Sequence, residues 1–463
     1  MFKRPLKIKK AIRIRFLLGV CIIILFGFFC KSPQQPNIIF IMCDDLGYGD
    51  LGCYGQSVIQ TPNIDNLAAE GMRFTHFYSG HTVCRPSRLV LWTGLHTGHT
   101  PISSNARYVF RPEDVTIAEL FREQGYVVGG VGKWSMYDAE MNGHPNDNGF
   151  DFWMGYLDQS EAHNYYPLYL WRNKSKVPLE GNVLYEKNSV NRGFVAKSRR
   201  TYSHDVMTDE AFRFIRENAD HPFLLHIHWT IPHANNQAGR FLGNGMEVPD
   251  YGPYAEKSWP DAEKGFAAMV SRMDDDVGEL LALLKELSID DETMIFFTSD
   301  NGPHHEGGHD HEFFDSNGQL RGYKRDLYEG GIRAPMIVRR PGVVPAGSIN
   351  DSPCAFWDYL PTACDLAEIK LSHPVDGISL LPALLGEAPP ARDYLYWQFK
   401  GNNHDKIAVR ADWWKAVRPA ADAELELYNL QNDPSEQTNI ADDFPEILER
   451  MQSYADDAVM PLK

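Results

Sequence analysis

The chain has 463 residues, enough for one large domain and a smaller companion. Of these residues 43% are hydrophobic and 23% are charged, a composition that is typical of a globular protein. Its formal net charge of −17 at pH 7 argues against nucleic-acid binding, because phosphate backbones are bound through clustered Lys and Arg. An anionic substrate must therefore be held by a few local cations. The 7 cysteines include no Cys-x-x-Cys pair, which indicates neither a zinc site nor a disulfide framework. Cys354 and Cys364 either form one bridge or stay free and buried.

Basic residues open the chain and are followed by one apolar run, residues 16–29. This run is shorter than the ~20 residues that usually span a bilayer, so residues 1–30 are interpreted as a secretory signal peptide rather than an uncleaved anchor. The alternative is a lipoprotein leader lipidated at Cys30, although Phe29 is bulky where such leaders carry a small residue. That lipid would be the protein's only membrane contact. We expect an exported protein in the periplasm, on the cell surface or secreted.

After a linker at residues 31–36, the apolar run 37–42 predicts a strand that is covered on both faces. The following elements alternate, with helices expected at 61–71, 116–125, 204–218 and 262–287 and strands at 126–131, 223–229 and 294–298. This alternation predicts an α/β fold with a large, mostly parallel sheet between helices, and functional groups outside the carboxyl ends of its strands. We assign residues 37–385 to this catalytic domain.

A Pro-rich stretch, residues 386–390, separates the catalytic domain from the tail. Residues 391–463 contain short apolar runs at 394–399, 407–409, 414–417 and 425–430, and a helical pattern at 445–454. These runs predict a small C-terminal α/β subdomain with an antiparallel sheet.

Carboxylate and amide side chains follow two of the predicted strands directly. Asp44 and Asp45 end the first strand, and Asp300 and Asn301 end the strand at 294–298. Either pair alone is typical of a turn or a helix cap. If the two strand ends converge, their hard oxygen donors suit Ca²⁺ or Mg²⁺ and not zinc.

Cys84 is followed by Pro86, Ser87 and the apolar run 89–92, which predicts that it stands at a helix N-terminus. The exposed N–H groups of such an end favour an anion. A lone cysteine is otherwise most often a small buried hydrophobe.

The segment Cys84-Arg85-Pro86-Ser87-Arg88 is similar to the signature of type I sulfatases, in which an oxidising enzyme converts the cysteine to formylglycine. Other segments resemble this arylsulfatase-like family in the same order: residues 37–45, 61–65, 93–94, 132–134, 149–151, 232–233, 299–302, 321–324, 330–335, 358–362 and 376–377. The resemblance implies the alkaline-phosphatase-like sandwich, with the small C-terminal sheet beside the cleft. It also implies hydrolysis of sulfate esters, with a sulfated carbohydrate, such as a galactose-type unit, as substrate.

The resemblance further implies a role for individual residues. Ca²⁺, with Mg²⁺ as the weaker alternative, would bind to four of them: Asp44, Asp45, Asp300 and Asn301. The catalytic group around Cys84 would comprise Arg88, Lys133, His233 and Lys324. In this group the arginine holds the aldehyde hydrate, the lysines bind sulfate oxygens, and the histidine protonates the departing alcohol. Cys84 would be matured by a formylglycine-generating or anaerobic sulfatase-maturating enzyme.

The chain departs from the family pattern at Ser135, where many members carry a histidine two places after the lysine. We hypothesise that His163 compensates for it from another loop. The loop 303–311 contains four histidines, and we interpret it as a flexible rim of the substrate site rather than a zinc site. His304 is the candidate there for a substrate contact.

Two other functions remain open at this point. A phosphonate monoester or phosphodiester hydrolase of the same superfamily would use the same formylglycine. An inactive glycan-binding relative would have lost its site, but the retained cysteine, cations and metal ligands argue against this.

Overall fold

The computed structural model describes Met1, residues 35–401 and residues 404–462. The predicted signal peptide, the lipidation site Cys30 and most of the linker lie outside the described residues. Among the residues that are described, no helix has the length and apolar character needed to cross a membrane. Residues 35–463 form one compact unit, and the description below concerns this unit.

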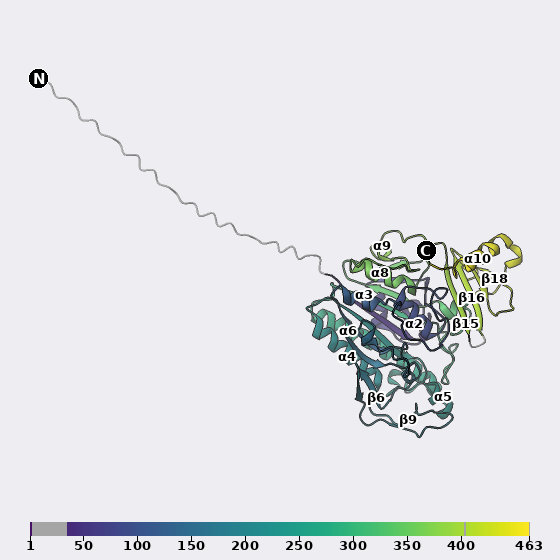
Figure 1. Cartoon of the computed structure of the whole chain (residues 1–463). Coiled ribbons are helices and arrows are strands. Elements are labelled where there is room, and N and C mark those ends of the chain that lie inside the picture. Colours follow the sequence, from purple (N-terminus) through teal and green to yellow (C-terminus); the bar gives the residue numbers. More distant parts are fainter. Residues whose placement is uncertain (2–34, 402–403, 463) are drawn as a thin grey trace. The chain divides into compact units, whose positions relative to one another are not determined.

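A sheet runs through the body between layers of helices (Figure 1). It has ten strands in the order β13-β2-β12-β11-β1-β10-β4-β5-β6-β7. Its five central strands are parallel: β11 (Thr293–Ser299), β1 (Asn37–Asp44), β10 (Phe223–Pro232), β4 (Val127–Lys133) and β5 (Phe152–Tyr156). Antiparallel pairings flank them through β12 (Met336–Arg339), β2 (Met72–Phe74), β6 (Tyr169–Arg172) and β7 (Ser175–Pro178), and β13 (Ser348–Asn350) pairs parallel with β2. The predicted α/β fold with a mostly parallel sheet is confirmed.

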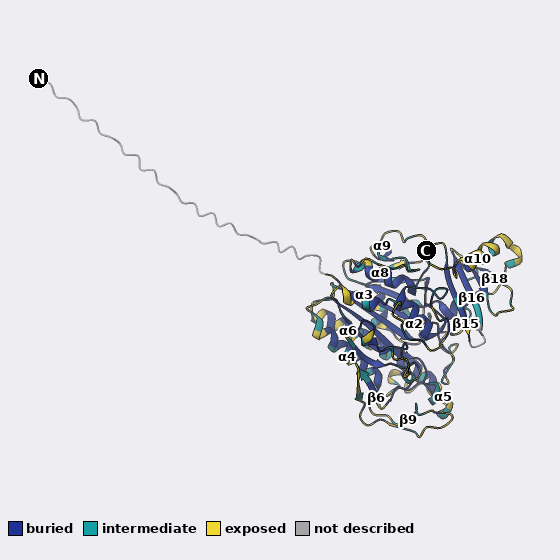
Figure 2. Ribbon diagram, in the orientation of Figure 1, coloured by how far each residue is buried: buried dark blue, intermediate teal, exposed yellow. Residues whose placement is uncertain are grey.

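Helices cover both faces of the sheet because the side chains of its central strands are apolar on both sides. Ile38, Phe40 and Met42 of β1 pack into the core that contains α2 (Cys84–Thr93), α3 (Ile117–Glu123) and α8 (Tyr359–Leu366). Ile39 and Ile41 pack into the opposite core, with α1 (Pro62–Ala69), α4 (Ser203–Asn218) and α6 (Asp261–Glu286). Figure 2 shows this interior as almost uniformly buried.

A separate four-stranded antiparallel sheet forms the C-terminal region, as predicted. It contains β15 (Leu395–Gly401), β16 (His404–Ala411), β17 (Trp414–Arg418) and β18 (Glu426–Asn429). The helix α10 (Pro445–Asp457) packs on β16 and β17 and places Met451 and Ala455 in their small apolar core. Residues 386–390, the predicted domain boundary, lie between α9 (Leu381–Leu384) and β15.

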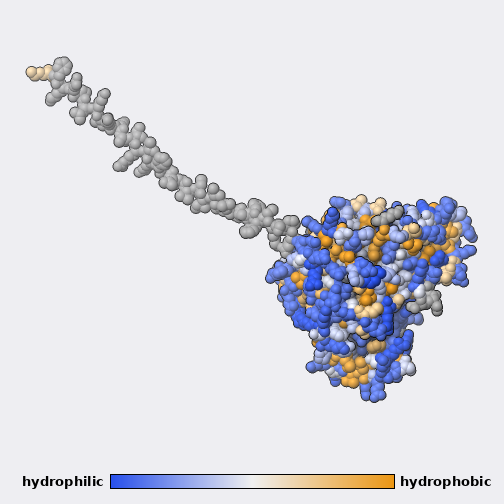
Figure 3. Space-filling model, viewed as in Figure 1, coloured by the Kyte–Doolittle hydropathy of each residue, from blue (hydrophilic) through white to orange (hydrophobic). Residues whose placement is uncertain are grey.

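The sequence pattern did not predict several short elements: β3 (Phe77–Tyr78), β8 (Val183–Leu184), β9 (Ala196–Ser198), β14 (Cys354–Ala355), α5 (Asn236–Leu242) and α7 (Glu329–Ile332). Cys354 and Cys364 are both free and buried, so the second of the two alternatives holds. On the face seen in Figure 3 the surface of the body is mostly hydrophilic, in keeping with its acidic composition.

Candidate active site

Four neighbouring parallel strands deliver polar side chains to one edge of the sheet. β1 ends at Asp44 with Asp45 directly after it, and β4 ends at Lys133. His233 follows β10, and Asp300 and Asn301 follow β11. The N-terminus of α2 brings Cys84 to the same place, where its thiol donates to Asp44 Oδ1 at 3.2 Å. The predicted convergence of strand ends is therefore present in the structure.

The carboxylates at this edge crowd together in the absence of solvent. Asp45 N donates to Asp300 Oδ1 at 3.2 Å, and Asn301 Nδ2 donates to Asp45 Oδ1 at 2.7 Å. Burial, together with the nearby charge of Asp44, raises the pKa of Asp300 to about 7. Asn301 Oδ1 is buried and has no hydrogen-bond partner among the described residues. An open oxygen beside crowded carboxylates fits a hard cation such as Ca²⁺ or Mg²⁺.

One atom from each of four side chains, those of Asp44, Asp45, Cys84 and His233, lies within 4.8 Å of the others. All four are buried. This cluster can hold a metal ion.

Three buried cations face the carboxylates. Lys133 Nζ lies 2.6 Å from Asp44 Oδ2, and Lys324 Nζ lies 2.7 Å from Asp45 Oδ2. Arg88 Nη2 lies 2.8 Å from Asp300 Oδ2. Burial alone would raise the pKa of Asp44, but the surrounding cations outweigh it and hold this pKa well below its usual range. The cations thus keep a fully buried carboxylate ionised.

His233 presents one ring nitrogen to the cluster. Its Nδ1 lies 2.7 Å from Ala234 O, and since a carbonyl oxygen only accepts, Nδ1 carries a proton. Its Nε2 lies 3.1 Å from Lys324 Nζ and 3.3 Å from Asp45 Oδ2. Nε2 is therefore the atom of His233 that can exchange a proton with a substrate.

His163, the predicted substitute for the missing family histidine, lies beside His233. It ends a short 3₁₀ turn, Glu161–His163, and its ring stacks on that of His233 with centroids 4.0 Å apart and planes at 20°. His163 Nε2 and Ser135 Oγ are both buried without a hydrogen-bond partner in the described part of the chain. The structure thus brings the two residues of the hypothesis into the site region, while the role of His163 stays a prediction.

The loop 303–311 is tied to the body more firmly than we expected. His304 is fully buried, its Nε2 lies 3.1 Å from Pro232 O, and its Nδ1 accepts from Glu306 N at 3.1 Å. His309 is buried and lies 2.6 Å from the Glu263 carboxylate of α6. Both ring nitrogens of His304 are bonded to backbone atoms, and its contact with substrate stays a prediction.

Sequence reasoning missed two charged residues next to the cluster. Glu306 Oε2 lies 3.7 Å from Lys324 Nζ and 4.0 Å from His233 Nε2. The other carboxylate oxygen of Glu306 forms an ion pair with Arg325. The only signal available was position, because Arg325 follows Lys324 directly.

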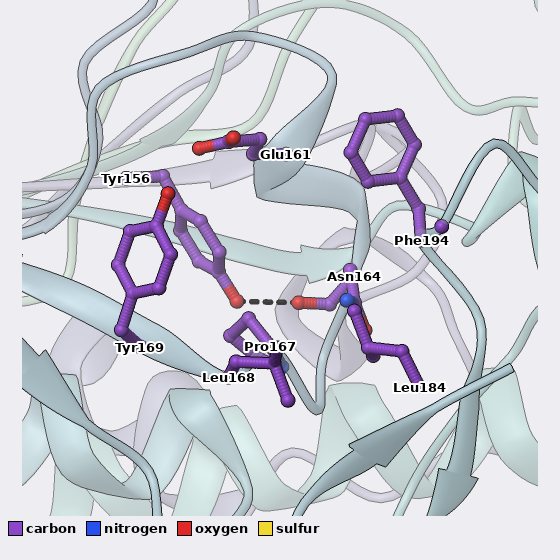
Figure 4. A pocket seen from close by; sticks show the side chains of 9 residues that line it. Tyr156, Glu161, Asn164, Pro167, Leu168, Tyr169, Leu184 and Phe194 are labelled. Atoms are coloured by element: carbon purple, nitrogen blue, oxygen red, sulfur yellow. Dashed lines mark hydrogen bonds between the residues drawn. The ribbon is translucent and has the colours of Figure 1, made fainter. Parts of the chain in front are cut away.

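A pocket of about 100 Å³ lies against the segment that carries His163 (Figure 4). The rings of Tyr156, Tyr169 and Phe194 surround it, with the Glu161 side chain at one side. Tyr156 Oη donates to Asn164 O at 2.5 Å and fixes one wall. Aromatic walls with one carboxylate suit a partly polar ring such as a sugar.

Comparison with known proteins agrees with this geometry. A model of the sulfatase family matches residues 36–369, and a model of the N-sulphoglucosamine sulphohydrolase C-terminal region matches residues 310–456. The chain therefore belongs to the sulfatase family. It is a sulfuric ester hydrolase, and its alkaline-phosphatase-like fold is that of its structural neighbours.

Individual relatives are similar over most of their length. N-acetylgalactosamine-6-sulfatase of Canis lupus familiaris is 32% identical, with 79% of this chain and 69% of the relative covered. N-acetylgalactosamine-6-O-sulfatase of Bacteroides thetaiotaomicron is 28% identical, with 91% and 92% covered. The crystal structure of Ps i-CgsB in complex with k-i-k-neocarrahexaose superimposes with a TM-score of 0.78 at 29% identity, with 92% of both chains covered.

Proposed function

We propose that the protein removes sulfate from sulfated carbohydrates, with Cys84 oxidised to formylglycine and with Ca²⁺ bound by Asp44, Asp45, Asp300 and Asn301. The observation that carries the proposal is the position of Cys84. Its thiol lies at a helix N-terminus, 3.2 Å from an ionised carboxylate and among three buried cations. A structural cysteine needs none of these neighbours, whereas transfer of a sulfuryl group needs all of them.

The two groups that the proposal adds have separate tasks. With position 84 oxidised, the hydrated aldehyde would supply a nucleophilic hydroxyl and a second hydroxyl whose deprotonation would release sulfate. Calcium held by Asp44, Asp45, Asp300 and Asn301 would supply positive charge beside that nucleophile and the sulfate oxygens.

The chain's own residues orient the substrate between these groups. Lys133, paired with Asp44, and Lys324, paired with Asp45, bind sulfate oxygens. Arg88 donates through Nη1 to Lys133 O at 2.9 Å, which holds its guanidinium beside position 84. His233 turns Nε2 towards the leaving oxygen, while the bond of Nδ1 to Ala234 O fixes the ring. Burial and Lys324 lower the pKa of His233, so the ring must take up a second proton as the sulfate anion binds; the imidazolium then gives its Nε2 proton to the leaving oxygen and is left neutral.

Two features support a carbohydrate substrate. The similar mammalian and bacterial enzymes are N-acetylgalactosamine-6-sulfatases, and the similar crystal structure holds a carrageenan-type oligosaccharide. The aromatic pocket beside His163 suits a sugar ring. The apolar run at residues 16–29 supports export, where such glycans are met. A formylglycine-generating or anaerobic sulfatase-maturating enzyme is the partner that this proposal requires.

Turnover and maturation should be measured together on the purified full-length protein. We expect hydrolysis of at least one defined sulfated saccharide, faster turnover of nitrophenyl sulfate than of the matched phosphate and phosphonate esters, and a peptide mass showing oxidised position 84. Unmodified cysteine in active protein would exclude the mechanism. Faster turnover of the phosphate or phosphonate ester would exclude sulfate esters as the preferred substrates.

The role of His163 has its own test. The variant His163→Ala should lower kcat for nitrophenyl sulfate by about 10- to 100-fold, because the ring that stacks on His233 also carries an unpaired nitrogen in the site. His221→Ala, at an exposed position after α4, is the matched control. Unchanged turnover in His163→Ala would refute the compensation for Ser135.

A further inference from the structure

Arg325 has a backbone conformation that an arginine seldom adopts. Its φ is 83°, in the left-handed region where a side chain clashes with its own backbone and where glycine is favoured. Three hydrogen bonds hold the backbone there: Arg325 N donates to Thr82 O at 3.1 Å and to Thr82 Oγ1 at 2.8 Å, and Lys406 Nζ donates to Arg325 O at 3.0 Å. Other non-glycine residues of this chain, such as Arg192, share a positive φ, but Arg325 directly follows Lys324 of the site, so we ask what its side chain does there.

The guanidinium of Arg325 lies at the edge of the catalytic cluster and reaches solvent. Its side chain is 48% exposed, against 3% for Lys324 and 2% for His233. It pairs with Glu306, whose other oxygen lies 4.0 Å from His233 Nε2. A single carboxylate therefore separates the exposed cation from the histidine that faces the leaving group.

The negative net charge of the protein makes an exposed cation important for binding an anionic glycan. With a net charge of −17, the protein repels polyanionic glycans except where cations are exposed. Lys133, Lys324 and Arg88 are buried and already face carboxylates, so they serve one sulfate group. The guanidinium of Arg325 can keep its ion pair with Glu306 and bind a second anion through its N–H groups that face solvent.

We propose that Arg325 forms a second anion subsite, which binds a carboxylate or sulfate group on the sugar next to the one that carries the reacting ester. This inference rests on the proposed function, because it assigns the specificity of the same site. The planar guanidinium recognises either anion through paired N–H donors, so Arg325 selects glycans with charges on adjacent sugars.

The test measures binding without turnover, so that it does not depend on maturation. Calorimetry on the Cys84→Ala protein would compare 6-sulfated N-acetylgalactosamine linked to galactose, to glucuronic acid, or to sulfated galactose. We expect at least one of the two doubly charged sugars to bind at least tenfold more tightly than the galactose-linked one. The two arms show which anion the subsite prefers.

Variants at position 325 separate recognition from folding. Arg325→Gly removes the side chain at a φ that glycine accepts freely, so the unfolding midpoint should stay or rise while the tenfold preference disappears. Arg325→Lys should keep part of the preference, because it retains a point charge without the planar fork. Arg122→Ala is the matched control. Arg122 lies on α3, its side chain is 54% exposed, and it also pairs with a carboxylate, that of Asp151.

Three results would overturn the inference: equal binding of all three sugars, no binding of any of them, or a preference that survives Arg325→Gly. None of these depends on hydrolysis. Failure of the proposed function would appear separately, as absent turnover or unmodified Cys84 in the full-length protein.

Discussion

Among the residues that the structure describes, two buried clusters combine lysine with carboxylates, and one of them forms the candidate active site. The second, here called the junction cluster, consists of Glu329, Lys415 and Glu436 with Arg333 and Arg410. Lys415 Nζ on β17 lies 2.9 Å from Glu329 Oε1 and 2.9 Å from Glu436 Oε1, and all three side chains are fully buried. It joins the C-terminal sheet to α7 of the catalytic body.

Burial and shifted pKa values do not distinguish the two clusters. Burial raises the pKa of Glu436, and Lys415 and Arg333 overcome burial to lower the pKa of Glu329. What distinguishes the active site is its composition: a thiol at a helix N-terminus and hard oxygens that converge at strand ends. The junction cluster instead links groups into internal bonds, such as Tyr78 Oη to Glu329 Oε2 at 2.7 Å. Perturbed ionisation marks a functional site only together with such composition.

Removal of the proposed nucleophile should have the largest effect. Cys84→Ala is expected to lower kcat by at least about 1,000-fold, since no other side chain can replace a covalent nucleophile. Its unfolding midpoint should change little, in contrast to variants of the junction cluster. Cys53→Ala, at a half-buried thiol, is the control and should remain active. Substantial turnover by Cys84→Ala would show that the thiol does not distinguish the active site from the junction cluster.

Metal removal should affect only the active-site cluster. Treatment with a calcium chelator is expected to lower turnover by about 100-fold, and Ca²⁺ should restore it better than Mg²⁺. Added Ca²⁺ should also raise the unfolding midpoint, because it binds the folded state alone. A variant of Asn301, whose Oδ1 is open, should lose this shift, whereas a variant of Glu436 should keep it. An unchanged midpoint in the wild-type protein would count against the metal site.

Breaking the junction cluster should cost stability rather than chemistry. Lys415→Met leaves two buried carboxylates without their shared cation, and we expect the free energy of unfolding to fall by about 3–5 kcal/mol. The folded fraction should retain kcat for nitrophenyl sulfate. Adding Glu436→Gln removes the second unpaired carboxylate while Glu329 keeps Arg333 as its partner, and should recover part of the loss in urea titrations. A loss of kcat without a loss of stability would assign this cluster a catalytic role.

The smallest effect concerns pH. Burial and the neighbouring Glu329 raise the folded-state pKa of Glu436 to about 7, above its unfolded value, so the folded protein binds this proton more tightly. Stability should therefore fall as the pH rises from about 4.5 to 7. Glu436→Gln should remove the part of this fall that comes from Glu436, about 2–3 kcal/mol between pH 5 and pH 8, while the part that comes from Asp300 remains. Glu446→Gln, on the exposed face of α10, is the control and should leave the pH profile as it is.

The central sheet was predictable because its signals are local. The apolar run of β1 and the capping box of Thr116 and Glu119, present in the structure with both reciprocal bonds, depend on neighbouring residues alone. The strand β7 was missed because its residues are mostly exposed, and only its pairing with β6 makes it a strand.

The site divides in the same way. Residues at strand ends, such as Asp44 and Asp300, could be expected to meet because parallel strands share one edge. The approach of Glu306 to Arg325 could not, because it depends on a left-handed arginine that local preference disfavours. The bonds of His304 to Pro232 and Glu306 were equally beyond prediction, since they arise from loop geometry that no spacing reveals.

The burial of Cys84 also bears on whether the thiol is oxidised before or after the chain folds. Its side chain is 1% exposed and lies on the first turn of α2 beneath the strand ends. An enzyme that oxidises this thiol cannot reach it once the body has folded. Under the proposed maturation, oxidation must precede closure of the sheet, so the chain must meet its maturating enzyme while still unfolded. Folding that is too fast would then yield a stable protein that is permanently inactive.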